Sequence, residues 1–145
     1  MDIETLVAAI DQGDFSMVEK MNIQTSAIIG NQCGRSSQDE FKFQGNRIIY
    51  LNSADRGVGK NRNLLIQNAT ADICIFADDD MRFVYGYPEI AKKAFEECAD
   101  ADILIFNLIE KQPRRYLNKK IKRIHGCNYA KYGAARIAFR RKPLL

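Results

Sequence analysis

Three consecutive carboxylates, Asp78-Asp79-Asp80, directly follow the apolar run Ile73-Cys74-Ile75-Phe76 and its neighbour Ala77. Adjacent carboxylates repel one another, and a hard divalent cation such as Mg²⁺ or Mn²⁺ can compensate their charge while leaving coordination positions for substrate phosphates. Because side chains alternate across a strand, we expect Asp78 and Asp80 to point to one side and Asp79 to the other. The alternative interpretation is an acidic turn that faces water, or carboxylates that cap the next helix.

A glycine-containing segment, Gly57 to Asn63, is the second place where chemistry could occur. Glycines that open a helix expose backbone N–H groups, and together with the helix dipole they can bind an anion. Lys60 and Arg62 add positive charge to this segment. The spacing matches neither the Walker loop nor Gly-x-Gly-x-x-Gly, so an ordinary turn between a strand and a helix is the alternative.

Apolar runs alternate with helix-period segments along the chain, which predicts an α/β domain with a mostly parallel sheet flanked by helices on both faces. The expected strands are residues 6–10, 27–30, 47–51, 73–76, 103–108 and 136–139. The expected helices are residues 16–21, opened by a Ser16–Glu19 capping box, residues 57–69 with Val58, Leu65 and Ala69 on one face, and a helix that starts near Pro88 with Ile90 and Phe95 in its apolar stripe. In such sheets ligands bind beyond the carboxyl ends of the strands.

The two segments together resemble family 2 glycosyltransferases, whose pattern runs G-V-S-x-x-R-N, then an alanine, then Y-I-x-F-L-D-x-D. The matching residues are Gly57-Val58-Gly59-Lys60-Asn61-Arg62-Asn63, Ala69 and Ile73 to Asp80. The resemblance extends to about Leu108 and, more loosely, over Gly133 to Arg140. It implies a Rossmann-like GT-A fold and transfer of a sugar from a nucleotide-diphosphate donor.

The resemblance also implies roles for individual residues. Asp80 would ligate a Mn²⁺ or Mg²⁺ ion that bridges the donor diphosphate. Asp78 would meet the ribose or the water shell of the metal, and Asp79 would be a further contact of the nucleotide sugar. Arg62 would lie near the base or the phosphates of the donor.

One departure from the family concerns Asn31. The family usually carries Asp-Asp-Gly-Ser after its second strand, and its first Asp reads the base edge; here the residues are Asn31-Gln32-Cys33-Gly34. An Asn side chain has both a donor and an acceptor and could still hydrogen-bond a base. The alternative is that Asn31 satisfies the hydrogen bonds of a turn.

The second departure concerns the end of the chain. Family members continue into an acceptor-binding half with an acidic general base, whereas residues 111–145 contain no Asp or Glu. His125 is the remaining candidate for a base or a late metal ligand, with no such role as the alternative, and the catalytic residue stays unknown. We therefore expect a donor-binding core over residues 1–110, a basic loop and final strand of the same domain over residues 111–145, and an incomplete acceptor half, as if the transferase were cut short.

Charge and composition limit the partners. Residues 111–145 hold 12 of the 22 Lys and Arg, so residues 1–110 carry 10 basic against 18 acidic residues, a net charge of −8. This asymmetry predicts contact of the tail with an anion, either phosphate, a membrane surface or the acidic half itself, unless it is only a solvated basic face. No RNA-binding signature is present, so nucleic acid is not expected. Four widely spaced cysteines and an acidic N-terminus favour the cytoplasm, with peripheral contact at the inner face of the membrane.

These observations leave three hypotheses. The first is a family 2-like glycosyltransferase with an unknown saccharide or lipid-linked acceptor, inactive as a shortened chain if the base is missing. The second is a non-catalytic module that binds a nucleotide sugar. The third is a nucleotidyltransferase, which the acidic residues Asp11-Gln12-Gly13-Asp14 after the first strand disfavour because that class carries a basic glycine-rich loop there.

Overall fold

The computed structural model describes residues 1–111, 119–126 and 132–142. The strands are β1 (Ile3–Ile10), β2 (Ser26–Gln32), β3 (Ser37–Phe43), β4 (Asn46–Ser53), β5 (Ile73–Asp78), β6 (Ile103–Ile105) and β7 (Ile137–Arg140). The helices are α1 (Met17–Lys20), α2 (Val58–Asn68), α3 (Tyr87–Glu97) and the 3₁₀ turn η2 (Ala134–Arg136). Within these described ranges, every helix is too short or too polar to cross a bilayer. The prediction of a long loop between Gln112 and Gly133 falls in large part on residues outside the described ranges.

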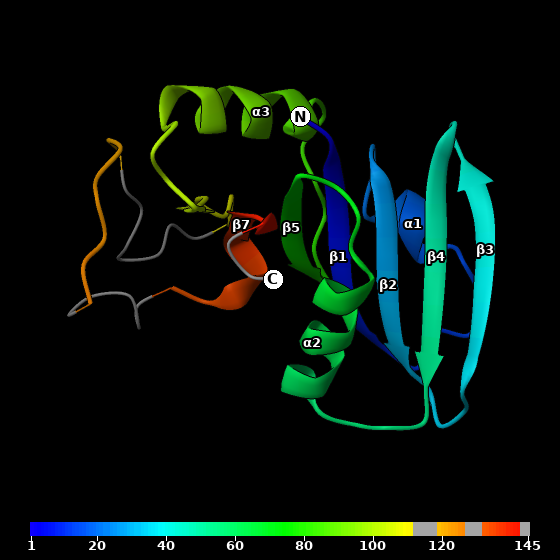
Figure 1. Cartoon of the computed structure of the whole chain (residues 1–145). Helices are drawn as coiled ribbons and strands as arrows, with labels where there is room; N and C mark the ends of the chain where they lie inside the picture. Colours follow the sequence, from blue (N-terminus) through cyan, green and yellow to red (C-terminus); the bar gives the residue numbers. More distant parts are fainter. Residues whose placement is uncertain (112–118, 127–131, 143–145) are drawn as a thin grey trace.

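All seven strands form one sheet in the order β3-β4-β2-β1-β5-β7-β6 (Figure 1). The four central strands β4, β2, β1 and β5 are parallel, as expected for buried apolar strands with helical crossovers. Both flanks are antiparallel, because β3 pairs with β4 on one side and β7 pairs with β5 and β6 on the other. The sheet is therefore mixed, with the parallel part confined to its centre.

The sequence patterns predict no strand over Ser37–Phe43, but these residues form β3, which makes a hairpin with β4. The two-residue turn between them is Gln44-Gly45, and both residues have positive φ, at 49° and 81°. Such a turn matches the twist of paired strands, and glycine tolerates its left-handed conformation. The available signal was the alternation of Phe41 and Phe43 with polar residues, since both side chains pack against the buried cluster behind the sheet.

Helices cover both faces of the sheet, and the alternation along β1 shows how. Val7 packs in a cluster with Met17 and Val18 of α1, whereas Leu6 packs with Leu65 of α2 on the opposite face. Helix α3 lies on the α1 side and buries Ala91 and Phe95 against β5 and β7, while Ile90 is exposed, contrary to expectation. At α2, Leu65 and Ala69, the residue that follows the helix, are buried but Val58 is exposed.

The prediction that Cys74 is a core residue is confirmed, and burial raises the pKa of its thiol to about 12.

The start of α1 differs from the predicted capping box. The Ser16 hydroxyl donates to the Asp14 carboxylate at 2.6 Å, and it makes no cap bond to the helix. Asp14 also accepts from the Ser16 backbone N–H, and both hydrogen bonds hold the pKa of the Asp14 carboxyl below its usual value. A local bond to a nearby carboxylate thus competes with the cap, as short polar side chains commonly do.

The final strand β7 joins the sheet through arginines that bind backbone carbonyls. Arg140 donates to the carbonyls of Ala101 and Phe95, and its guanidinium lies 5.0 Å from the centroid of the Phe95 ring. Arg141 donates to the Ala71 carbonyl just before β5. A guanidinium at the carboxyl end of α3 complements the helix dipole. These basic residues of the tail therefore have structural partners within the domain.

The close approach of α2 to β2 requires glycine at position 30. The Asn61 side-chain amide donates to the Gly30 carbonyl at 2.7 Å, and a methyl group at Gly30 would overlap that amide.

We predict that Gly30→Ala lowers the free energy of unfolding by about 1–3 kcal/mol, measured by urea titration, because overpacking destabilises a core. Gly13→Ala is the control, since its added carbon meets nothing within 4 Å. Equal stability of the two variants would contradict the close approach.

Candidate functional site

The carboxyl ends of the four parallel strands meet at one edge of the sheet, the lower edge in Figure 1. The register places Asp78 beside Ala8, and Asn31 between Ala9 and Asn52. Residues that are distant in sequence thus share this edge. In α/β sheets of this kind, ligands bind beyond the carboxyl ends of the parallel strands, so this edge is the expected ligand site.

Strand β5 ends at Asp78, and the chain then turns. The Met81 backbone N–H donates to the Asp78 carbonyl at 3.2 Å, so Asp79 and Asp80 occupy the two central positions of a turn. The assumption that the strand alternation continues to Asp80 is therefore wrong. Because the backbone reverses after Asp78, the three carboxylates have three different environments.

Asp78 forms an ion pair with Arg62 of α2. Arg62 Nη2 lies 3.0 Å from Asp78 Oδ1, and the two side chains are 23% and 42% exposed. The guanidinium also lies 5.9 Å from the centroid of the Phe76 ring. Its Nε is buried and has no acceptor among the residues that the structure describes. Two sequence-predicted site residues are thus brought into direct contact.

Asp79 is half-buried, and its side chain contacts the end of β1. Its Oδ2 accepts from the Ile10 backbone N–H at 3.0 Å and from Gln12 Nε2 at 3.2 Å. Its own backbone N–H donates to the Ala8 carbonyl at 3.2 Å. Three hydrogen bonds therefore attach this residue to β1 and the loop that follows it.

Asp80 is exposed, and within the described part of the chain its carboxylate has no hydrogen bond or ion pair. The described residues contain no group of three or more Asp, Glu, His or Cys side chains arranged to hold a metal. Magnesium, however, is commonly held by one or two carboxylates together with substrate phosphates and water. The hard oxygen donors of Asp80 and Asp78 fit that kind of ion, although they do not form a complete cage.

Asn31 is buried, and all of its side-chain hydrogen-bonding groups have partners. Its Oδ1 accepts from the Gln12 backbone N–H, and its Nδ2 donates to the Gln12 carbonyl, both at 3.0 Å. The second Nδ2 hydrogen goes to Asn52 Oδ1 at 2.9 Å. This is the arrangement that the turn-satisfying alternative predicts; direct contact of Asn31 with a base stays an untested prediction.

Gln12 and Asn52 belong to this edge, and sequence reasoning missed both. Asn52 is 7% exposed and also donates to Ser37 Oγ and to Asp39 Oδ2. In the sequence, each is an ordinary polar residue of a turn or a strand end, and neither belongs to a recognisable motif. Their position at the ends of β1 and β4, next to Asn31 on β2, was the signal that could have identified them.

The amino end of α2 opens toward the same edge. Gly57 precedes the helix with φ of 136°, and its N–H donates to Gln32 Oε1 at 2.7 Å. Beside it lies a hollow of about 330 Å³ lined by the polar side chains of Gln32, Ser53, Asp55, Lys60, Asn61, Asn63 and Gln67, with Leu64. The glycine segment therefore is a strand-to-helix turn that also borders an open polar cavity.

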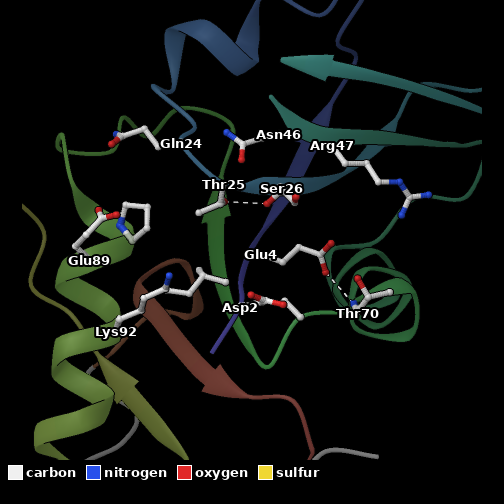
Figure 2. A pocket seen from close by; sticks show the side chains of 13 residues that line it. Asp2, Glu4, Gln24, Thr25, Ser26, Asn46, Arg47, Thr70, Glu89 and Lys92 are labelled. Atoms are coloured by element: carbon white, nitrogen blue, oxygen red, sulfur yellow. Dashed lines mark hydrogen bonds between the residues drawn. The ribbon is translucent and has the colours of Figure 1, made fainter. Parts of the chain in front are cut away.

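A second hollow of about 390 Å³ lies at the opposite edge, among the amino ends of β1, β2 and β4 (Figure 2). Its lining carries both charges, from Glu4, Glu89, Arg47 and Lys92. Glu4 is 4% exposed and accepts from the Thr70 backbone N–H at 2.9 Å. The hollow contains none of the predicted site residues.

His125 is exposed in the basic segment 119–126, which lies apart from the sheet in Figure 1.

Solved structures with the same fold identify the architecture. The chain superposes on S. aureus TarS 1-349 with a TM-score of 0.71 at 13% sequence identity, covering 99% of this chain and 48% of that one. For the TarS complex with UDP-GlcNAc the TM-score is 0.67 at 14% identity, covering 99% and 46%. For the complex with UDP it is 0.70 at 14% identity, covering 99% and 48%. The expected GT-A glycosyltransferase fold is confirmed.

The sequence pattern described as Glycosyl transferase family 2 matches residues 35–143, and the chain belongs to that family. This confirms the resemblance carried by the glycine segment and the acidic triplet. No curated protein sequence matches the chain. The chain spans about half the length of the TarS structures that it resembles.

The contact between Arg62 and Asp78 makes a prediction about stability. Because both side chains are partly exposed, their double-mutant coupling energy should be about 0.2–1 kcal/mol and should fall as salt is added. Arg62→Met keeps the aliphatic stem on Phe76, and Asp78→Asn keeps the size of the carboxylate. Urea unfolding of both single variants and the double variant measures the coupling. A value above about 3 kcal/mol, independent of salt, would show a fully buried pair instead.

Proposed function

We propose that this chain forms the donor-binding half of a glycosyltransferase that moves a sugar from a nucleotide-diphosphate donor to a saccharide or lipid-linked acceptor. One observation carries the proposal: Asp80 is exposed at the carboxyl end of β5, next to the Arg62–Asp78 pair. Family membership supports the reaction class. The TarS complexes with UDP-GlcNAc and UDP support a nucleotide sugar as the donor class.

Arg62 is suited to the donor phosphates. A guanidinium offers five N–H donors, and the hydrogen bond to Asp78 uses one of them. Its position at the first turns of α2 adds to the positive potential of the helix amino end. Arg62 would thus bind the diphosphate or the base while the Asp78 carboxylate holds its orientation.

Asp80 would hold a divalent cation, Mn²⁺ or Mg²⁺, with Asp78 assisting. Carboxylate oxygens are the ligands that these ions prefer, and the free carboxylate of Asp80 faces solvent where a diphosphate can approach. When bound, such an ion neutralises negative charge that develops on the leaving diphosphate. The residues of the chain supply the anchoring and the orientation of the donor.

A non-catalytic nucleotide-sugar-binding module is the second candidate. Its donor contacts would be the same, because binding through the Arg62–Asp78 pair and the exposed Asp80 carboxylate requires no general base. The same donor site would then bind without turnover, acting with another chain. Donor binding in the absence of nucleotide release identifies this case. Family membership gives no support to the third hypothesis, a nucleotidyltransferase.

Thermal unfolding with a panel of nucleotide sugars, with and without Mn²⁺, tests the donor site. At a donor concentration of 100 times its dissociation constant we expect stabilisation by about 2.7 kcal/mol. The shift should require Mn²⁺ and should disappear in Asp80→Ala, because the metal would lose its carboxylate.

Asp102→Ala is the matched control, since Asp102 is an exposed carboxylate just before β6, at the opposite edge of the sheet. This variant should keep the full shift. An equal shift in Asp80→Ala and the parent protein would remove Asp80 from the donor site.

A further inference from the structure

The three carboxylates of the triplet do not share one function in this geometry. Asp78 is paired with Arg62 and Asp80 is exposed, whereas Asp79 Oδ2 already accepts two N–H groups. Both donors come from the end of β1, namely the Ile10 backbone and the Gln12 side chain. Asp79 therefore differs from its neighbours in that its carboxylate bonds to the end of β1 and the loop that follows it.

Gln12 is itself fixed by buried amides. Its backbone N–H and carbonyl both bond to the side chain of Asn31, at 3.0 Å each. Asn31 in turn donates to Asn52, and the two asparagines are 1% and 7% exposed. A continuous chain of hydrogen bonds thus runs along the carboxyl edge from β4 through β2 and β1 to the turn after β5.

We propose that Asp79 is a positioning residue, which with Gln12 fixes the turn after β5 and so directs the Asp80 carboxylate, and that Asp79 is neither a metal ligand nor a donor contact. The inference rests on the proposed function only in assigning the metal to Asp80. It replaces the expectation that Asp79 contacts the nucleotide sugar.

The turn geometry explains how Asp79 acts on its neighbour. Asp79 and Asp80 are the central residues of a turn closed by the bond from the Met81 N–H to the Asp78 carbonyl. Asp79 is held at both ends, by its side chain and by the bond from its own N–H to the Ala8 carbonyl. Restricting the backbone at the first central position restricts the direction of the second side chain.

The two roles for Asp79 predict different effects of removing its charge. A carboxylate that ligates a divalent cation contributes its negative charge, so a neutral amide in its place binds the ion more weakly, whereas a hydrogen-bond acceptor need only supply an oxygen. Asp79→Asn keeps an oxygen that can accept from Ile10 and Gln12 and removes the charge. Asp79→Ala removes both, and Gln12→Met removes the amide donor at nearly constant length.

The test measures binding of Mn²⁺ in the presence of UDP, from the free-ion electron paramagnetic resonance signal, together with amide hydrogen exchange at Ile10. We expect Asp79→Asn to bind Mn²⁺ almost as the parent does and to keep the Ile10 amide protected. Asp79→Ala and Gln12→Met should weaken Mn²⁺ binding about tenfold, the usual cost of removing an outer partner of a metal ligand. The Ile10 amide should exchange faster in Asp79→Ala. Asp80→Asn should lose detectable Mn²⁺ binding.

Three results would overturn the inference. Loss of Mn²⁺ binding in Asp79→Asn with the Ile10 amide still protected would make Asp79 a ligand. Parent-like Mn²⁺ binding in both Asp79→Ala and Gln12→Met would show that the contact positions nothing. Parent-like Mn²⁺ binding in Asp80→Asn would refute the proposed metal site and, with it, this role of Asp79. The Asp80→Asn variant therefore distinguishes failure of the proposed function from failure of the Asp79 inference alone. If Asp79→Ala fails to fold, Asp79→Asn and Gln12→Met still decide the question.

Discussion

The parallel pairing of β1 with β5 is the constraint on which the site depends. Its register sets Ala8 beside Asp78, although 70 positions separate them in the sequence. The ladder is held in place because both faces are buried, with Leu6 packed toward α2 and Val7 toward α1. A slip of one residue would exchange these faces, so that Leu6 and Val7 would each meet the cluster that packs around the other. The acidic turn therefore meets the β1 loop at a fixed position.

The carboxyl edge is then stabilised by neutral amides rather than by buried charge. Asn31 and Asn52 lie at the ends of neighbouring parallel strands, and their side chains satisfy each other and the backbone of Gln12. A buried amide costs little when every donor and acceptor is paired, and it costs about 1–3 kcal/mol when one is left without a partner. Such a network holds the loop after β1 with defined geometry.

The same edge shows how three adjacent carboxylates are tolerated. Arg62 compensates Asp78, two N–H donors stabilise Asp79, and water solvates Asp80. Repulsion within the triplet is therefore relieved by the protein itself, so repulsion alone is not the argument for a bound cation. The argument for a cation is the exposed carboxylate of Asp80 beside a guanidinium, at the edge where this fold class binds its ligands.

Sequence patterns predict the α/β class, the central strands, the helix after Gly57, the family and the position of the acidic triplet at a strand end. Each of these depends on local spacing, because burial on two faces gives continuous apolar runs and helices repeat with their own period. The folded structure was needed to show that β3 and β7 run antiparallel, that β5 stops at Asp78, and that Asp79 bonds to Gln12 while Asp78 pairs with Arg62. These outcomes depend on which strands become neighbours and where the strand ends meet. Contacts between residues distant in sequence determine both, so local sequence patterns do not predict them.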